Sequence, residues 1–350
     1  MRGEPAITLQ PIFDLETAIR PSILSSPENP WPSVFLHAGW RCGSTYVWSR
    51  FRALAGTTCF YEPFAERLAH VSPKRLGRDT AQGWDSRHPP LELPYREEFR
   101  PVLRRLRRGV RGYRESFAVQ RYFPQGGARP EIAYLQRLIK HARGRGTVPV
   151  LGFSRSLARA AALKAGLGGY HIVLRRNAPQ QWLSCRSYRV PGAVPYFELS
   201  HALILAHAPP DSPAARLAAS LHLPHLPRWS GQIKRQLRTL HAMLGPWDDT
   251  RSYQVFIGVY LLSQALAAPA ADLLLDVDRL GESSAYRAAA CARIRADSSL
   301  PVDFSDARTS HHDGTEGGVD FEAIEAQIRD RLLAFGARLD PTVAAGALIQ

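Results

Sequence analysis

Short apolar runs alternate along the chain with longer stretches in which apolar residues recur every three or four positions. The short runs are bounded by Gly, Pro or polar residues and predict strands over residues 33–38, 58–61, 148–153, 171–174 and 272–277. The longer stretches predict helices over residues 44–54, 97–114, 131–143, 156–165, 229–244, 252–267, 284–294 and 320–335. Because strands and helices alternate, we expect an α/β fold with a mostly parallel central sheet flanked by helices.

The same pattern indicates how the chain is organised. Residues 1–30 lack periodicity and predict an irregular N-terminal arm. Residues 31–340 predict a single α/β domain, since they contain neither an internal repeat nor a linker. Within this domain, residues 72–95, 190–230 and 305–318 are rich in Pro, Ala, Gly or charge and predict irregular segments.

Several features bear on the compartment. The apolar stretch 255–271 contains Ser263, Gln264 and Pro269 and is shorter than the ~20 residues that a membrane span needs, so we expect a buried helix there. The first residues include acids and prolines and lack the apolar segment typical of a signal peptide. The four cysteines form no CxxC pair, which is typical of free thiols in a reducing compartment. We therefore expect a cytoplasmic protein with no transmembrane segment.

Charge narrows the choice of partner. Lys and Arg number 45 against 31 Asp and Glu, and the formal net charge is +14. This surplus indicates an anionic partner, such as a nucleotide, a nucleic acid, an acidic glycan or a lipid surface. A non-catalytic nucleic-acid-binding protein ranks low among the alternatives, because the sequence has no helix-turn-helix, zinc or RRM motif. No cluster of residues has the spacing of a metal site, so no metal is expected.

The turn after the first predicted strand carries a candidate phosphate-binding motif, HAGWRCGST over residues 37–45. A turn between a strand and a helix directs backbone N–H groups and the positive end of the helix at one point. Gly43 allows close approach of the backbone, Ser44 and Thr45 add hydroxyl donors, and Arg41 adds a forked cation. A Walker A loop would have Lys after this Gly, so the motif weakens an ATPase or kinase interpretation. An ordinary turn without a ligand is the alternative.

A second motif follows the strand predicted over residues 171–174 and reads RRNAPQQWLS over residues 175–184. Arg176 and Ser184 are eight residues apart, at the start of the turn and within the predicted helix. This spacing brings a guanidinium and a hydroxyl toward one phosphate group. The alternative is an Arg-rich strand end that pairs with surface acids.

In this order, and each after a core strand, the two motifs resemble those of the PAPS-dependent sulfotransferases. RCGSTY (residues 41–46) resembles the 5′-phosphosulfate loop of that family, and residues 175–184 resemble its 3′-phosphate motif. YEPF (residues 61–64) resembles a Tyr-Glu-Pro segment of carbohydrate sulfotransferases, and DLLLDVDR (residues 272–279) is similar to a late strand of bacterial members. The chain is closer to bacterial or carbohydrate-type members, because Arg41 stands where many cytosolic members have Lys. The resemblance implies a P-loop-like sulfotransferase fold.

The resemblance also implies an activity. The donor would be PAPS (3′-phosphoadenylyl sulfate), without a metal, and the acceptor would be a hydroxyl group, with a sugar or glycoconjugate as the expected substrate. Arg41 would neutralise charge on the bridging oxygen that leaves with the phosphate. The donor-binding residues implied are Arg41, Cys42, Gly43, Ser44, Thr45, Tyr46, Arg176 and Ser184.

A carboxylate is the first candidate for the base that takes the acceptor proton. Glu62 ends a predicted strand beside the phosphate loop. The alternative is that Glu62 pairs with Arg41 or Arg155 and only orders the site. His37 and His70 are further candidates for the base. Arg155 and His70 are also candidates for contact with the substrate.

A P-loop-type kinase is the main alternative enzyme. Such an enzyme needs Mg²⁺ and usually the Walker lysine. Asp276 and Asp278, near a predicted strand end, are the only carboxylates that suggest a Mg²⁺ site.

Three further features bear on the acceptor. Irregular regions 65–130 and 190–230 are expected to shape its binding site. Residues 310–314 (SHHDG) are interpreted as an ordinary loop or as a lid over the donor. Arginines spaced three or four apart would form one stripe on the helix predicted over residues 97–114, either as a solvated face or as a platform for an acidic acceptor. These are Arg100, Arg104, Arg107, Arg111 and Arg114, flanked by Arg105 and Arg108.

Overall fold

The computed structural model describes residues 32–80, 91–105, 108–123, 127–226, 232–245, 247–312 and 318–339. All of them belong to the unit that runs from residue 31 to residue 350. The arm predicted over residues 1–30 lies outside the described residues, as do Arg107 of the arginine stripe and residues 313–317 of the predicted C-terminal loop.

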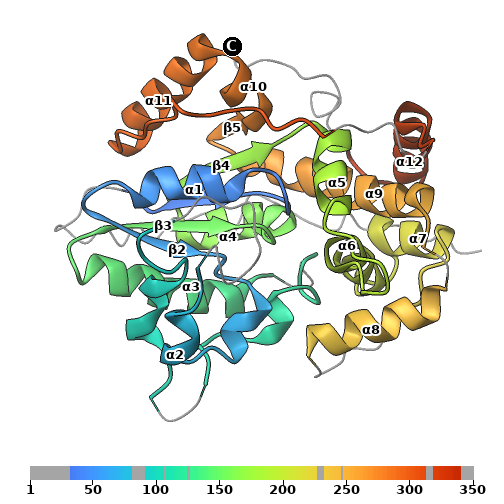
Figure 1. Ribbon diagram of the computed structural model, residues 1–350, viewed down its shortest axis with the longest axis horizontal. Coiled ribbons are helices and arrows are strands. Elements are labelled where there is room, and N and C mark those ends of the chain that lie inside the picture. Colours follow the sequence, from blue (N-terminus) through green and yellow to red (C-terminus); the bar gives the residue numbers. More distant parts are fainter. Residues whose placement is uncertain are drawn as a thin grey trace, which may run out of the picture. The chain divides into compact units, whose positions relative to one another are not determined.

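A five-stranded sheet forms the centre of the described unit (Figure 1). Its strands are β1 (Val34–His37), β2 (Thr57–Tyr61), β3 (Val148–Phe153), β4 (Tyr170–Arg175) and β5 (Leu273–Asp276). Their order is β2-β3-β1-β4-β5, and all four pairings are parallel. The predicted α/β class and parallel sheet are confirmed, and each predicted strand agrees within two residues at either end.

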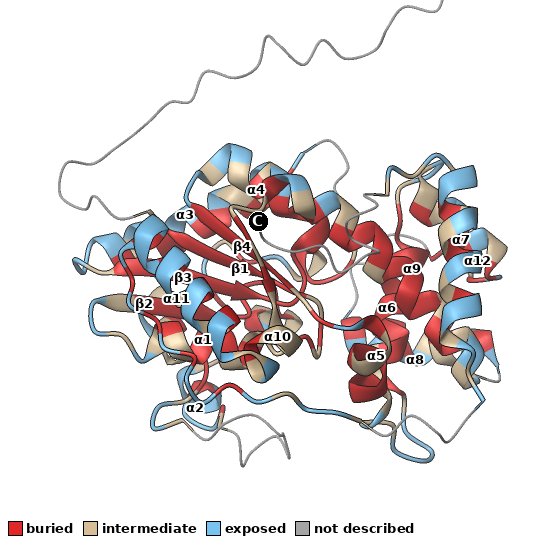
Figure 2. Ribbon diagram, turned by 90° about the horizontal axis from the view of Figure 1, so that it is seen from above, coloured by how far each residue is buried: buried red, intermediate tan, exposed pale blue. Residues whose placement is uncertain are grey.

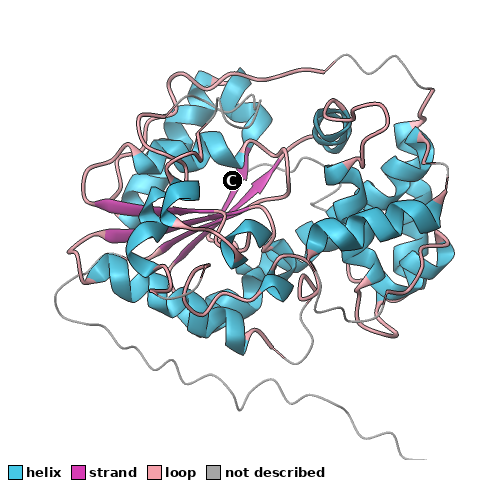
Figure 3. Ribbon diagram, turned by 60° about the horizontal axis from the view of Figure 1, so that its bottom comes forward, coloured by secondary structure: helices cyan, strands magenta, loops and turns pink. Residues whose placement is uncertain are grey.

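Helices cover both faces of this sheet, which explains why its strands are apolar without interruption. Successive side chains of β1 point to opposite faces, as strand geometry requires. Val34 and Leu36 pack with the helices of one layer, and Phe35 packs with those of the other. The first layer consists of α1 (Ser44–Arg52), α10 (Val277–Glu282) and α11 (Ser284–Ser298), and the second contains α3 (Arg129–Arg143) and α4 (Ala160–Leu167) (Figures 1 and 3).

A second group of helices has its own core beside the sheet (Figure 1). Its members are α5 (Ala178–Arg186), α6 (Tyr196–Ala206), α7 (Pro213–Ser220), α8 (Ile233–Leu244), α9 (Asp249–Ala267) and α12 (Phe321–Ala334). By length and composition, Asp249–Ala270 would suffice to cross a membrane, yet 67% of the apolar 18-residue window within it is buried in the fold. It packs against α6 and α12 and lies in the red interior of Figure 2, as expected for a core helix.

The structure corrects the prediction of an irregular segment over residues 190–230, because α6 and α7 lie within it. Every residue of α6 from Glu198 to Ala206 is buried. A helix that is buried on all sides shows no alternation of polar and apolar faces, so its periodicity is invisible in the sequence.

The helix predicted over residues 97–114 is also wrong. A short 3₁₀ segment, Glu97–Val102, is followed by an isolated antiparallel bridge between Leu103 and Val110. Pro101 lies in the 3₁₀ segment, and Gly109 has a φ of 94°. A Cβ at Gly109 would lie 2.3 Å from the carbonyl oxygen of Ala69, so the chain turns where only glycine fits. The arginines therefore do not form a helical stripe.

The remaining elements are short. Residues 72–95, predicted as a loop, contain α2 (Pro73–Leu76), which Ser72 caps. The predicted helix 156–165 begins as a 3₁₀ turn, Leu157–Arg159, before α4. Further 3₁₀ turns cover Glu66–Ala69, Glu115–Phe117 and Ala268–Ala270.

Candidate functional site

The turn between β1 and α1 lies at the carboxyl end of the sheet, as the sequence predicted. Arg41 and Gly43 both have positive φ angles, 63° and 79°. A Cβ at Gly43 would lie 2.7 Å from Cγ1 of Val277, so this position accepts only glycine without displacement. The turn places Ser44 and Thr45, the first residues of α1, in the walls of two cavities.

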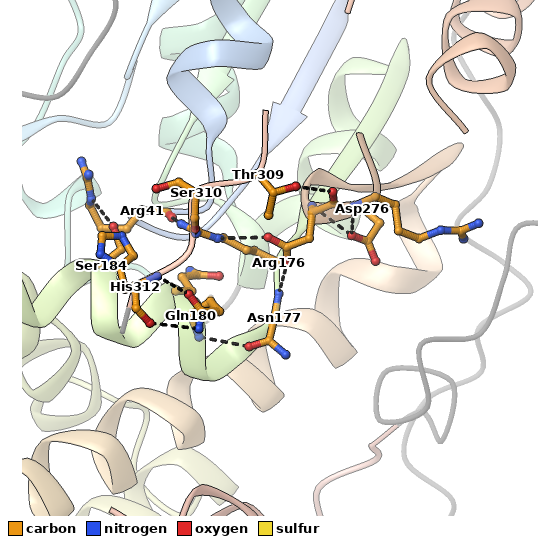
Figure 4. Close-up of polar contacts among 12 residues, drawn as sticks. Arg41, Arg176, Asn177, Gln180, Ser184, Asp276, Thr309, Ser310 and His312 are labelled. Atoms are coloured by element: carbon orange, nitrogen blue, oxygen red, sulfur yellow. Dashed lines mark hydrogen bonds and ion pairs between the residues drawn. The ribbon is translucent and has the colours of Figure 1, made fainter. Parts of the chain in front are cut away.

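The first cavity has a volume of about 400 Å³ and brings the two predicted motifs together. Its wall includes Arg41, Ser44, Thr45, Arg176 and Ser184. Arg41 Nε donates to Ser184 Oγ at 3.2 Å, which joins the motifs directly (Figure 4). Two cations, three hydroxyls and a helix N-terminus suit a ligand with more than one anionic group.

Arg176 is 8% exposed and is held by three groups from different parts of the chain (Figure 4). Its Nε donates to Asp278 Oδ1 at 3.3 Å, and its Nη1 donates to the Arg41 carbonyl at 3.1 Å. Its Nη2 donates to the carbonyl of Ser310. The guanidinium is therefore positioned before any ligand is bound.

A C-terminal segment forms another part of the wall of the first cavity. The sequence associated this segment with the site only through residues 310–314, which were interpreted as an ordinary loop or as a lid over the donor. The residues of this segment that line the cavity are Asp306, Ala307, Arg308, Thr309, Ser310 and His312. Thr309 Oγ1 donates to the Asp278 carbonyl at 3.1 Å. Gln180 exchanges two hydrogen bonds with the backbone of His312, at 2.8 and 3.3 Å. The segment is thus fixed to α5 and α10.

The second cavity has a volume of about 440 Å³ and is lined by part of the same turn. It shares Arg41, Ser44 and Thr45 with the first cavity. Its other walls include Glu62 and residues of both irregular regions expected to shape an acceptor site. These wall residues include Trp40, Tyr61, Ala65, Glu66, Arg67, Arg96, Ser154, Arg155, Tyr188, Tyr196, Phe197 and Lys234.

Glu62 follows β2 directly and is 6% exposed, with a φ of 53°. Its backbone N–H donates to the Gly152 carbonyl at 2.8 Å, which holds this unusual conformation. Ser154 Oγ and Arg155 Nη1 both donate to its Oε2, at 2.6 and 2.8 Å. Within the described ranges no side chain hydrogen-bonds to its Oε1. One carboxylate oxygen is therefore anchored while the other is left for a ligand.

Arg155 connects Glu62 to a second carboxylate that the sequence did not single out. Arg155 Nη2 donates to Glu66 Oε2 at 2.9 Å and to the Tyr196 hydroxyl at 3.0 Å. Tyr196 in turn donates to Glu66 Oε1 at 2.7 Å. Burial opposes ionisation of Glu66, but Arg155 and Tyr196 outweigh it and lower the pKa of Glu66. Two carboxylates in the wall of the second cavity, Glu62 and Glu66, are therefore both ion-paired with Arg155.

The other predicted donor-binding residues take different positions. Thr45 is 6% exposed, and its Oγ1 lies 2.8 Å from the Tyr61 hydroxyl. Tyr46 lines the first cavity and donates to Asp306 Oδ1 at 2.7 Å. Cys42 is fully buried, which raises the pKa of its thiol to about 12, and it lines neither cavity.

Neither histidine proposed as an alternative base lines the first or the second cavity. His37 is fully buried, with Nδ1 2.7 Å from Ser156 Oγ and Nε2 2.9 Å from His171 Nδ1. Burial, reinforced by His171, lowers the pKa of His37. His70 is half-exposed, and its Nε2 lies 3.7 Å from Glu115 Oε2. The structure thus places Glu62 in the wall of the second cavity and leaves both histidines outside the two cavities.

The described residues contain no group of three or more His, Cys, Asp or Glu side chains arranged to hold a metal ion. Asp276 Oδ1 accepts from the N–H groups of Asp278 and Arg279, both at 3.1 Å. Asp278 accepts from Arg176 and from the backbone N–H of Asn177, at 3.3 and 2.7 Å. Both carboxylates suggested for Mg²⁺ are therefore engaged in capping and pairing.

Comparisons with family models, with curated proteins and with solved structures find no match to this chain.

Proposed function

We propose that this chain is a sulfotransferase that moves the sulfuryl group of PAPS to a hydroxyl acceptor, on a P-loop-like sulfotransferase fold. The observation that carries the proposal is the turn shared by two cavities. Arg41, Ser44 and Thr45 line both cavities. A donor in the first cavity could therefore present its sulfuryl group, at this shared wall, to an acceptor in the second cavity. This arrangement suits direct transfer between two bound molecules.

The donor would occupy the first cavity. Its volume of about 400 Å³ lies within the usual range for small-molecule sites, about 300–1,000 Å³. Ser44, Thr45 and the first N–H groups of α1 would hold the 5′-phosphate. Arg176 and Ser184, the latter 2% exposed, would hold the 3′-phosphate. Both are buried, which strengthens their interaction with an anion.

The reaction would proceed by in-line displacement at sulfur. The acceptor oxygen forms a bond to sulfur while the bond between sulfur and the 5′-phosphate oxygen breaks. The acceptor proton goes to a base, and the products are a sulfate ester and adenosine 3′,5′-bisphosphate. Negative charge grows on the leaving oxygen, beside Arg41, and removal of one such donor commonly lowers the rate ~10²–10³-fold.

Glu62 is the proposed base. It lines the second cavity, where the acceptor hydroxyl would lie, and its Oε1 is not hydrogen-bonded within the described ranges. Its ion pair with Arg155, which was the alternative interpretation, involves only Oε2. The two roles are therefore compatible: Arg155 orients the carboxylate, and Oε1 takes the proton.

The test is calorimetric titration of the full-length protein with adenosine 3′,5′-bisphosphate and with ATP plus Mg²⁺, at near-physiological salt. We expect metal-independent binding of the bisphosphate that exceeds binding of ATP. Preferential binding of ATP with Mg²⁺ would replace the proposal with a kinase. Binding of neither nucleotide would reject a donor site in the first cavity.

A further inference from the structure

Arg41 differs from the other arginines of the two cavity walls because no carboxylate is paired with it. In the second cavity Arg155 pairs with Glu62 at 2.8 Å, and in the first cavity Arg176 pairs with Asp278 at 3.3 Å. Within the described ranges Arg41 forms no ion pair with an acidic side chain. The positive charge of Arg41 is therefore not cancelled by the part of the chain that the structure describes.

Two aromatic rings lie against the Arg41 guanidinium in place of a carboxylate. Its central carbon is 4.5 Å from the centroid of the Tyr188 ring and 5.9 Å from the centroid of the Phe197 ring. The two rings meet edge to face, with centroids 5.5 Å apart. All three side chains line the second cavity. A cation within about 6 Å of an aromatic centroid is attracted by the negative face of the ring, and the planar guanidinium is well suited to this contact.

The hydrogen bonds of Arg41 show what such a contact leaves available. Among the described residues, the only hydrogen bond that its side chain makes is from Nε to Ser184 Oγ, at 3.2 Å. A carboxylate partner would engage the donors on Nη1 and Nη2 and would cancel the charge. A ring face has no net charge, so the guanidinium is held and remains able to act on an anionic ligand.

The end of helix α5 places Tyr188 beside Arg41. The Tyr188 N–H donates to the Cys185 carbonyl at 3.2 Å, which continues the helical turn just past the end of α5. Ser184, which accepts from Arg41, lies four residues earlier in the same helix. Residues four apart in a helix lie on one face, so this segment presents both a hydroxyl and a ring to one guanidinium.

We propose that Tyr188 is a positioning residue that holds the Arg41 guanidinium at the wall shared by the two cavities without neutralising its charge. This inference rests on the proposed function, in which Arg41 lies beside the 5′-phosphate oxygen that leaves. A guanidinium that is already held in place does not have to be ordered when the donor binds, which favours binding. Phe197 lies farther from Arg41 and contributes less to this effect.

The test is calorimetric titration of the full chain with adenosine 3′,5′-bisphosphate, using Y188L, R41Q and the double variant Y188L/R41Q. We expect Y188L to weaken binding about fivefold in the native background, within the range of a cation–π contact, and less than about twofold in the R41Q background. Y188F should bind as the native chain does, because the ring remains. The matched control is F335L, since Phe335 is partly buried at the end of α12 and lines neither cavity.

Each outcome of these titrations decides between the inference and an alternative. Equal affinities of Y188L and Y188F would overturn the inference, even where R41Q binds too weakly to be titrated. Equal losses from Y188L in the native and R41Q backgrounds would overturn it in favour of a structural role for the ring. Undiminished binding in Y188L would reject this inference and leave the proposed function standing. Failure of the native chain to bind the bisphosphate would reject the proposed function and this inference with it.

Discussion

Replacement of Arg155 by Met tests how much the free energy of unfolding depends on the guanidinium that lines the second cavity. Arg155 is 5% exposed and donates to Glu62, Glu66 and Tyr196 at 2.8, 2.9 and 3.0 Å. The variant keeps an unbranched side chain of similar length but leaves the buried Glu62 and the largely buried Glu66 without the guanidinium that they share. Breaking a buried ion pair in this way costs about 3–5 kcal/mol in the free energy of unfolding. R155M should therefore be strongly destabilised at neutral pH.

The assay is urea denaturation followed by circular dichroism from neutral to acidic pH. The pKa of Glu66 is lowered in the folded chain, so its stabilisation is present above the unfolded pKa, about 4.3, and is lost as the pH falls through the folded pKa. In R155M this contribution is absent, and protonation relieves the unpaired carboxylates. The difference between native chain and variant should therefore shrink as the pH falls.

A matched variant isolates the charge. R155M/E66Q removes one of the two unpaired carboxylates, so it should recover part of the stability that R155M loses. A loss in R155M of less than about 1 kcal/mol at neutral pH, the value typical of an exposed pair, would refute the reasoning. A difference that does not depend on pH would refute it as well.

Three further predictions concern the site and the core. Gly43→Val should weaken binding of adenosine 3′,5′-bisphosphate in calorimetry, because the positive φ and the contact with Val277 displace the turn; undiminished binding would contradict the geometry of the donor site. Glu62→Gln should lower kcat by ~10²–10⁴ in a sulfate-transfer assay and leave bisphosphate affinity unchanged, and an intact kcat would remove Glu62 as the base. Burial lowers the pKa of His171 to about 4, so native stability should fall from about pH 6.5 toward pH 4 as the unfolded chain takes up the proton first. His171→Phe should flatten that slope in urea titrations, and an unchanged slope would assign it to other groups.

Sequence patterns predicted the parts of the site that are local in the chain. Strand, turn and helix follow one another within residues 34–52 and again within residues 170–186, so spacing alone placed Arg41, Ser44 and Ser184 at the carboxyl end of the sheet. Apolar runs also identified the five strands of the sheet in the described residues, because strands covered on both faces are apolar throughout.

The missed parts depend on contacts between distant segments. Tyr196 reaches Arg155 across 41 positions, and Ser310 reaches Arg176 across 134. Local sequence patterns cannot predict such pairs, because the residues next to each partner in the sequence give no signal of the contact. Glu66 was overlooked for the same reason: its significance comes from Arg155, 89 positions away.

The wall that the two cavities share has a thermodynamic consequence. Arg41 contributes to both cavities, and its carbonyl and its side chain hold Arg176 and Ser184. If both cavities hold ligands as proposed, a ligand that orders the Arg41 side chain from one cavity would change the affinity of the other cavity for its ligand, and the two binding equilibria would be linked. Linkage is reciprocal: whatever factor a bound bisphosphate applies to acceptor affinity, the acceptor must apply to bisphosphate affinity. Under the proposed function, Arg41 would set the sign and size of that common factor.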